Sequence, residues 1–149
     1  MGLCPSDALY EKRLELLQLL NIPKTGELQV LPPPVYISPE LLAFVRAFNM
    51  NKEQLEHWIK SERAIDLLHI DCALETELDS KTWQYLQIRL MLLLRAFPST
   101  LEQDEAQFEK LKGNKSQRMY IKKMLLEYRI LEKRILSAAL DYAKQRTKV

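Results

Sequence analysis

Glycine, cysteine and histidine are scarce in this sequence of 149 residues, which holds three, two and two of them, respectively. The glycines, Gly2, Gly26 and Gly113, lie too far apart for the G-x-x-x-x-G-K or G-x-G-x-x-G loops that bind phosphate groups. Nucleotide-binding folds built on those loops are therefore excluded. The shortage of glycine also indicates few tight turns and favours a helical protein.

The two cysteines, Cys4 and Cys72, are not needed to explain folding. A chain of about 150 residues buries roughly two-thirds of its unfolded surface, which suffices for a hydrophobic core without disulfides. Few cysteines and no signal-peptide pattern after Met1 indicate an intracellular compartment, the cytoplasm or the nucleus. The most apolar run, residues 90–94, is closed by arginine at both ends, far short of the roughly 20 residues that cross a bilayer. We expect no membrane partner.

Residues suited to catalysis or metal binding are few. His69 and Cys72 have H-x-x-C spacing, but a zinc site normally needs four ligands and no second pair follows. Nothing in the sequence near either cysteine lowers a thiol pKa in an obvious way. The acidic residues of 102–109 lie in the first turns of an expected helix, where the helix dipole explains them. We assign the chain no catalytic, cofactor-binding or metal-binding residue and expect no catalysis from residues 1–149 alone.

Helix-start and helix-stop signals predict an all-α fold. The predicted fold has two long helices and a proline-rich extended connector over residues 21–37. We expect residues 1–149 to form one domain, with a lead-in helix and connector over 5–37 and a helical core over 38–149. Ser6 is the expected cap of the first helix. Ser38 is the expected cap of a second helix, with Pro39 at its first position, and capping boxes are expected at Asn51 and Thr100. We also expect a turn at 64–68, a central helix over about 78–97, and a last helix over about 117–145 that is capped by Ser116.

The net charge of +2 hides an uneven distribution. Residues 1–109 hold 10 basic and 17 acidic residues, a net of −7, whereas residues 110–149 hold 12 and 3, a net of +9. On the last helix, apolar residues at alternating four- and three-residue steps form a narrow seam that we expect to dock against the core: Met124, Tyr128, Leu131, Ile135, Ala138 and Tyr142. Nearly opposite lies a basic ridge that we expect to face outward as the candidate partner-binding surface: Lys115, Arg118, Lys122, Arg129 and Lys133.

Three segments occur in an order that resembles a known family: residues 41–56 (LLAFVRAFNMNKEQLE), 92–105 (LLLRAFPSTLEQDE) and 128–136 (YRILEKRIL). Together they resemble the C-terminal substrate-binding helical domain of the Rubisco large-subunit methyltransferase family. Members of that family are SET-domain protein-lysine methyltransferases. The resemblance covers about residues 6–145. Leu131 stands where the family usually has glycine, which suggests altered packing there.

The resemblance implies a substrate-recognition domain that packs beside a SET domain absent from this chain. The parent enzyme would bind S-adenosylmethionine and methylate a lysine of a histone or non-histone protein, so the implied partners are that protein substrate and the parent SET domain. The alternative is a free-standing helical module that uses the basic helix to bind a protein or, less readily, nucleic acid.

Overall fold

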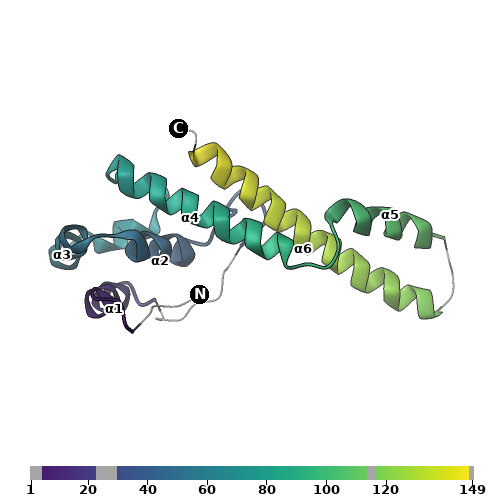
Figure 1. Cartoon of the computed structure of the whole chain (residues 1–149), viewed down its shortest axis with the longest axis horizontal. Helices are drawn as coiled ribbons and strands as arrows, with labels where there is room; N and C mark the ends of the chain where they lie inside the picture. The colour runs from purple at the N-terminus through teal and green to yellow at the C-terminus, as the bar shows by residue number, and fades with distance from the viewer. Residues whose placement is uncertain (1–4, 23–29, 114–116, 148–149) are drawn as a thin grey trace.

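The computed structural model describes residues 5–22, 30–113 and 117–147, with side chains from residue 119 onward in the last segment (Figure 1). Its elements are α1 (Tyr10–Leu19), α2 (Pro39–Asn49), α3 (Lys52–Lys60), the 3-10 turn η1 (Ala64–Leu68), α4 (Thr76–Arg95), α5 (Leu101–Leu111) and α6 (Gln117–Thr147). Extended pairing within these ranges is limited to one bridge between Val30 and Ile37 in the connector. The all-α prediction is confirmed, including its two long helices, α4 and α6.

Local capping residues set the start of three helices as predicted. The Ser38 hydroxyl accepts a hydrogen bond from the Leu41 amide at the start of α2, which begins with Pro39. Asn51 with Gln54, and Thr100 with Gln103, form complete capping boxes at α3 and α5. Each box satisfies amide donors that have no partner inside the helix, which is why these starts are readable from a few residues.

The predicted cap of the first helix is wrong. α1 begins at Tyr10 rather than after Ser6, and its N-cap position is Leu9, which has no side-chain cap in the described structure. Asp7 instead forms a turn before the helix: its carboxylate accepts a hydrogen bond from the Leu9 amide at 3.1 Å, and its carbonyl accepts one from Tyr10. The predicted cap at Ser116 lies outside the described residues.

The main core lies where α1, α2, α4 and the second half of α6 meet. Trp83, Leu86 and Leu90 of α4 are buried in it, which agrees with the expected central position of that helix. Arg46 of α2 is also fully buried and donates hydrogen bonds to the carbonyls of Leu67 and His69. The arginine thus holds η1 and the turn after it against α2.

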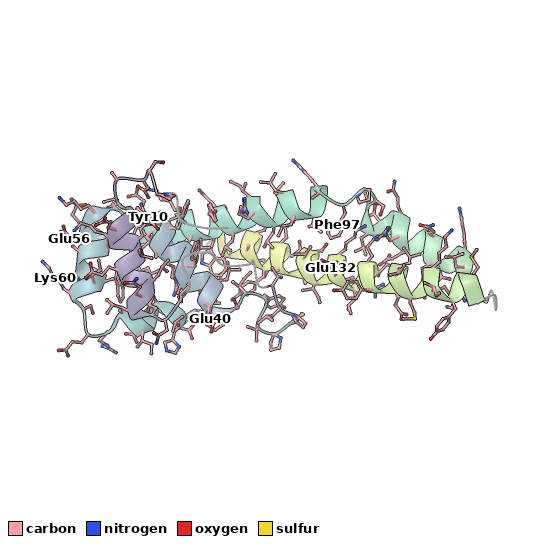
Figure 2. All side chains as sticks on the ribbon, turned by 90° about the horizontal axis from the view of Figure 1, so that it is seen from below. Tyr10, Glu40, Glu56, Lys60, Phe97 and Glu132 are labelled. Carbon is pink, nitrogen blue, oxygen red and sulfur yellow. The ribbon has the colours of Figure 1, made fainter. Side chains whose placement is uncertain are left out.

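The helices make an elongated molecule (Figure 1). α1, α2 and α3 gather at one end beside the first part of α4, and α4 and α6 run side by side along the middle. At the other end α5 and the first half of α6 form an antiparallel hairpin that extends beyond α4, as Figure 2 also shows. No helix among the described residues combines the length and apolarity needed to cross a membrane.

Candidate protein-interaction surface

The α5–α6 hairpin carries the candidate surface, and a buried cluster at its base fixes its position. Lys133 is 1% exposed, and its ammonium donates hydrogen bonds to the Ser99 carbonyl at 2.7 Å, to the Ser99 hydroxyl at 3.0 Å and to the carboxylate of Asp104. Its ammonium also lies 4.9 Å from the centre of the Phe97 ring. Figure 2 shows Phe97 at the corner between α4 and α5, next to the part of α6 that carries Glu132. Lys133 therefore ties this corner to α6.

Asp104 is the acidic partner in this cluster. Burial by itself would raise the pKa of its carboxyl, but the hydrogen bonds from Lys133 and Ser99 and the nearby positive charge outweigh burial, so the pKa lies below its ordinary value. The charged carboxylate is thus the form that the folded protein stabilises. Asp104 has a structural role beyond complementing the helix dipole.

The basic ridge is only partly as predicted. Lys122 and Arg129 are exposed, as expected, but Lys133 is buried, so its predicted outward position is wrong. Lys115 lies outside the described residues, and the side chain of Arg118 is not described.

Sequence reasoning missed the face of α6 that packs toward α5. Leu126, Ile130 and Lys133 are buried on that face and follow one another at steps of four and three residues. That spacing is the sequence signal that could have predicted this buried face, because Lys133 continues an apolar stripe. A lysine at such a position needs a buried acidic partner, and Asp104 supplies it.

The predicted seam is covered over one half of its length and exposed over the other. Tyr142 is half-buried; its ring stacks on Tyr36 of the connector at 4.6 Å and meets the ring of Trp83 edge-on at 5.6 Å. Towards the start of α6, by contrast, Met124, Tyr128 and Leu131 are each more than half exposed, so their predicted docking within this chain is wrong. The physical reason is that α4 ends at Arg95 and α5 packs on a different side of α6.

Together with their neighbours, these residues form an apolar surface on the hairpin. We call it the exposed apolar face and define it by six residues, each more than half exposed: Tyr120, Ile121, Met124, Leu125, Tyr128 and Leu131. At 100° per residue they span about 140° of the helix. Isolated exposed apolar residues are ordinary, whereas a continuous set of this kind makes this part of α6 a candidate interaction surface.

Two surface grooves border the hairpin between α5 and α6. One, of about 250 Å³, is lined by Gln107, Leu111, Lys122, Leu125, Leu126 and Arg129. The other, of about 440 Å³, is lined by Glu105, Phe108, Glu109, Glu127, Ile130, Leu131 and Arg134. Lys122 and Arg129 thus stand beside the exposed apolar face and give that edge a positive charge.

Leu131, which occupies the usual glycine position of the resembling motif, is 56% exposed and lines the second groove. Its side chain adds apolar surface to the groove rather than entering a close helix contact. We expected altered packing at this position; in the described part of the chain Leu131 instead adds to the exposed surface of the hairpin.

The residues with the most reactive side chains lie at the opposite end of the molecule. His57, His69 and Cys72 line an open groove of about 520 Å³ between α3 and the segment after η1. Partial burial raises the pKa of the Cys72 thiol, so the unreactive protonated form is favoured. Within the described ranges no three His, Cys, Asp or Glu side chains are grouped so that they could hold a metal ion.

Comparison with known proteins gives a consistent picture. A family model described as Rubisco LSMT substrate-binding matches residues 4–136. An actin-histidine N-methyltransferase of Drosophila melanogaster is 51% identical over 100% of this chain and 27% of its own length. The proteins of that name from Gallus gallus and Homo sapiens are 35% and 33% identical, over 97% and 95% of this chain and 26% and 24% of their own lengths.

The fold also matches a solved structure, Rubisco LSMT bound to AdoMet. The TM-score is 0.70 over 99% of this chain and 33% of that one, at 18% sequence identity, which shows a shared fold. The chain spans about a quarter of the length of the curated relatives it matches.

Proposed function

Because the chain belongs to the Rubisco LSMT substrate-binding family, we propose that it is the substrate-holding part of a protein methyltransferase that acts on a histidine of actin. The observation that carries the proposal is the 51% identity to the Drosophila actin-histidine N-methyltransferase along the entire chain. The resemblance alone implied a lysine of a histone or another protein as the target. The names of the relatives favour a histidine, and actin as the protein that carries it.

The methyl transfer is assigned to the remainder of the parent protein. S-adenosylmethionine is the methyl donor expected there, consistent with the AdoMet bound in the structural neighbour. The grooves described in this chain lie open on its surface, whereas a site for a cofactor of that size encloses most of its ligand. We propose that the remainder of the parent protein holds this cofactor.

A chimeric enzyme tests the proposal. Residues 1–149 replace the matching segment of the Drosophila relative, and methylation of monomeric actin is followed with labelled S-adenosylmethionine. We expect the chimera to methylate a histidine of actin, and we expect an enzyme that lacks this segment to lose that activity. A folded chimera that binds S-adenosylmethionine but does not methylate actin would overturn the proposal.

A further inference from the structure

The exposed apolar face continues a surface of α6 that is already an interface. Further along the same helix, the seam is covered where Tyr142 packs against Tyr36 and Trp83. From Leu131 back to Tyr120 the same side of the helix faces solvent. The apolar residues of α6 therefore continue beyond the point where other parts of this chain pack on them. Such an arrangement is typical of a surface that binds another protein.

The composition of the face favours a partner that binds and leaves. It includes two tyrosines and a methionine, and Tyr128 is 69% exposed. Tyrosine supplies a large contact area and is frequent at energetic centres of protein interfaces, and methionine adapts to differently shaped partners. Lys122 and Arg129 remain exposed at the edge of the face, which gives it the apolar centre and polar rim of a non-obligate interface.

The basic charge of one edge of the face, beside Leu125, narrows the chemistry of the partner, whereas the groove beside Leu131 carries the acidic Glu127. The two exposed basic residues flank Leu125 and line the same groove. Lys133, the third described member of the predicted ridge, is neutralised by Asp104 and cannot contribute to the rim. A partner with an apolar strip and acidic residues along one edge fits this arrangement.

We propose that the exposed apolar face and the basic rim, Lys122 and Arg129, dock the protein substrate through an apolar, acid-edged segment of its surface. This inference rests on the proposed function and takes actin as the substrate. The projecting position of the hairpin supports this occupant, because α5 and the start of α6 extend away from the helical body and leave the face accessible to a bulky protein (Figures 1 and 2).

Binding of monomeric actin to the 149-residue chain tests the docking surface. The variant Met124→Gln with Tyr128→Gln removes apolar area without adding charge, and glutamine retains helix propensity. We expect its dissociation constant for actin to rise by about tenfold or more, the loss typical of residues at an interface centre. The matched control is Ile88→Gln with Leu92→Gln on α4, since both residues are also more than half exposed, and we expect it to bind as the original chain does.

The rim is tested separately by Lys122→Glu with Arg129→Glu. We expect weaker actin binding and a smaller dependence of affinity on salt, since opposite charges across an interface are screened by ions. Circular dichroism and urea unfolding of all variants confirm that folding is retained.

The outcomes separate this inference from the proposed function. If the original chain binds actin and the Met124, Tyr128 variant binds equally well, the docking surface is overturned while the proposed function stands. If the original chain does not bind actin, the docking inference fails; an active chimera would then still support the proposed function, and an inactive one would overturn both.

Other occupants are excluded by two further measurements. A dimer at assay concentration that the Met124, Tyr128 variant dissociates would identify a second copy as the occupant and overturn the proposal. In the chimeric enzyme, Tyr128→Cys should react readily with a thiol reagent and become protected when actin is added. Protection without actin would show that the parent enzyme itself covers the face, which would also overturn the proposal.

Discussion

Lys133 of α6 and Asp104 of α5 form a buried ion pair across the hairpin, although they stand 29 positions apart in the chain. Both side chains are almost completely inaccessible to solvent. Ser99 completes the cluster by donating a hydrogen bond from its hydroxyl to Asp104 and accepting one from Lys133. The pair therefore determines how α5, and with it the projecting hairpin, is attached to α6.

Replacing Lys133 by methionine should destabilise the protein strongly. The variant keeps an unbranched side chain but leaves the Asp104 carboxylate buried without its cation, and breaking a buried pair in this way costs about 3–5 kcal/mol. The free energy of unfolding, measured by urea titration, checks the value. The double variant Lys133→Met with Asp104→Leu should recover much of the loss, because no buried charge remains. An unchanged stability in the single variant would contradict the structural role of the pair.

The pH dependence of stability should reveal Asp104. Its pKa in the folded protein lies below that of the unfolded chain, about 3.9. Between these two values the unfolded chain binds the proton and the folded chain does not, so the stabilisation is complete above about pH 4 and is lost as the pH falls through the folded pKa. The original protein and Asp104→Asn should therefore differ most near neutral pH and converge in acid.

Urea titrations from pH 7 to pH 2 provide the comparison. The carboxyls of Asp7 and Glu56 also have pKa values lowered by hydrogen bonds, so both proteins lose some stability in acid. The difference between the two curves isolates Asp104. A difference that is constant with pH would show that its carboxylate contributes no charge-dependent stability.

Arg13 should be important for stability although it lies near the start of the chain. Its guanidinium donates hydrogen bonds to the carbonyls of Ala47, Phe48 and Met50 at 2.6, 2.7 and 3.0 Å, which satisfies the C-terminal end of α2. Arg13→Met leaves those acceptors poorly satisfied, and we expect a loss of about 2–3 kcal/mol. The neighbouring Lys12→Met is the control, because Lys12 forms a partly exposed pair with Glu56, worth about 0–1 kcal/mol.

The stacked rings of Tyr36 and Tyr142 should couple the connector to α6. A double-mutant cycle with Tyr36→Leu and Tyr142→Leu measures this contact, and we expect a coupling of about 0.5–1.5 kcal/mol. The residual effect of Tyr142→Leu should exceed that of Tyr36→Leu, because Tyr142 also contacts Trp83. A coupling near zero would mean that this ring contact does not help to hold the connector on α6.

The helix boundaries were largely predictable because the signals for them are local. Ser38, Asn51 and Thr100 each bond to an amide three positions ahead, so sequence and structure agree at these starts. The prediction that Ser6 caps the first helix was wrong because Asp7 forms a turn at that point instead. The family resemblance was likewise predictable, since it depends on ordered motifs in one chain.

The orientation of α6 was not predictable in the same way. The first half of α6 buries Leu126, Ile130 and Lys133, and the second half buries Leu136, Ala139 and Ala143. At 100° per residue, these two buried faces point in directions that differ by roughly 110° around the helix axis. The first half packs against α5 and the second against α4, which meet the helix from different sides. A single apolar stripe read from the sequence cannot show which neighbour covers it, or over what length.

The sequence by itself determined that this protein is helical, where most helices start, which family it resembles, and that its last helix is both basic and apolar. Tertiary structure decided which of those residues are available to a partner. Lys133 is withdrawn because Asp104, distant in the chain, lies beside it in the fold, and Met124, Tyr128 and Leu131 are exposed because α4 ends before reaching them. Periodicity depends on neighbours along one helix, whereas exposure depends on which other helix occupies the adjacent space.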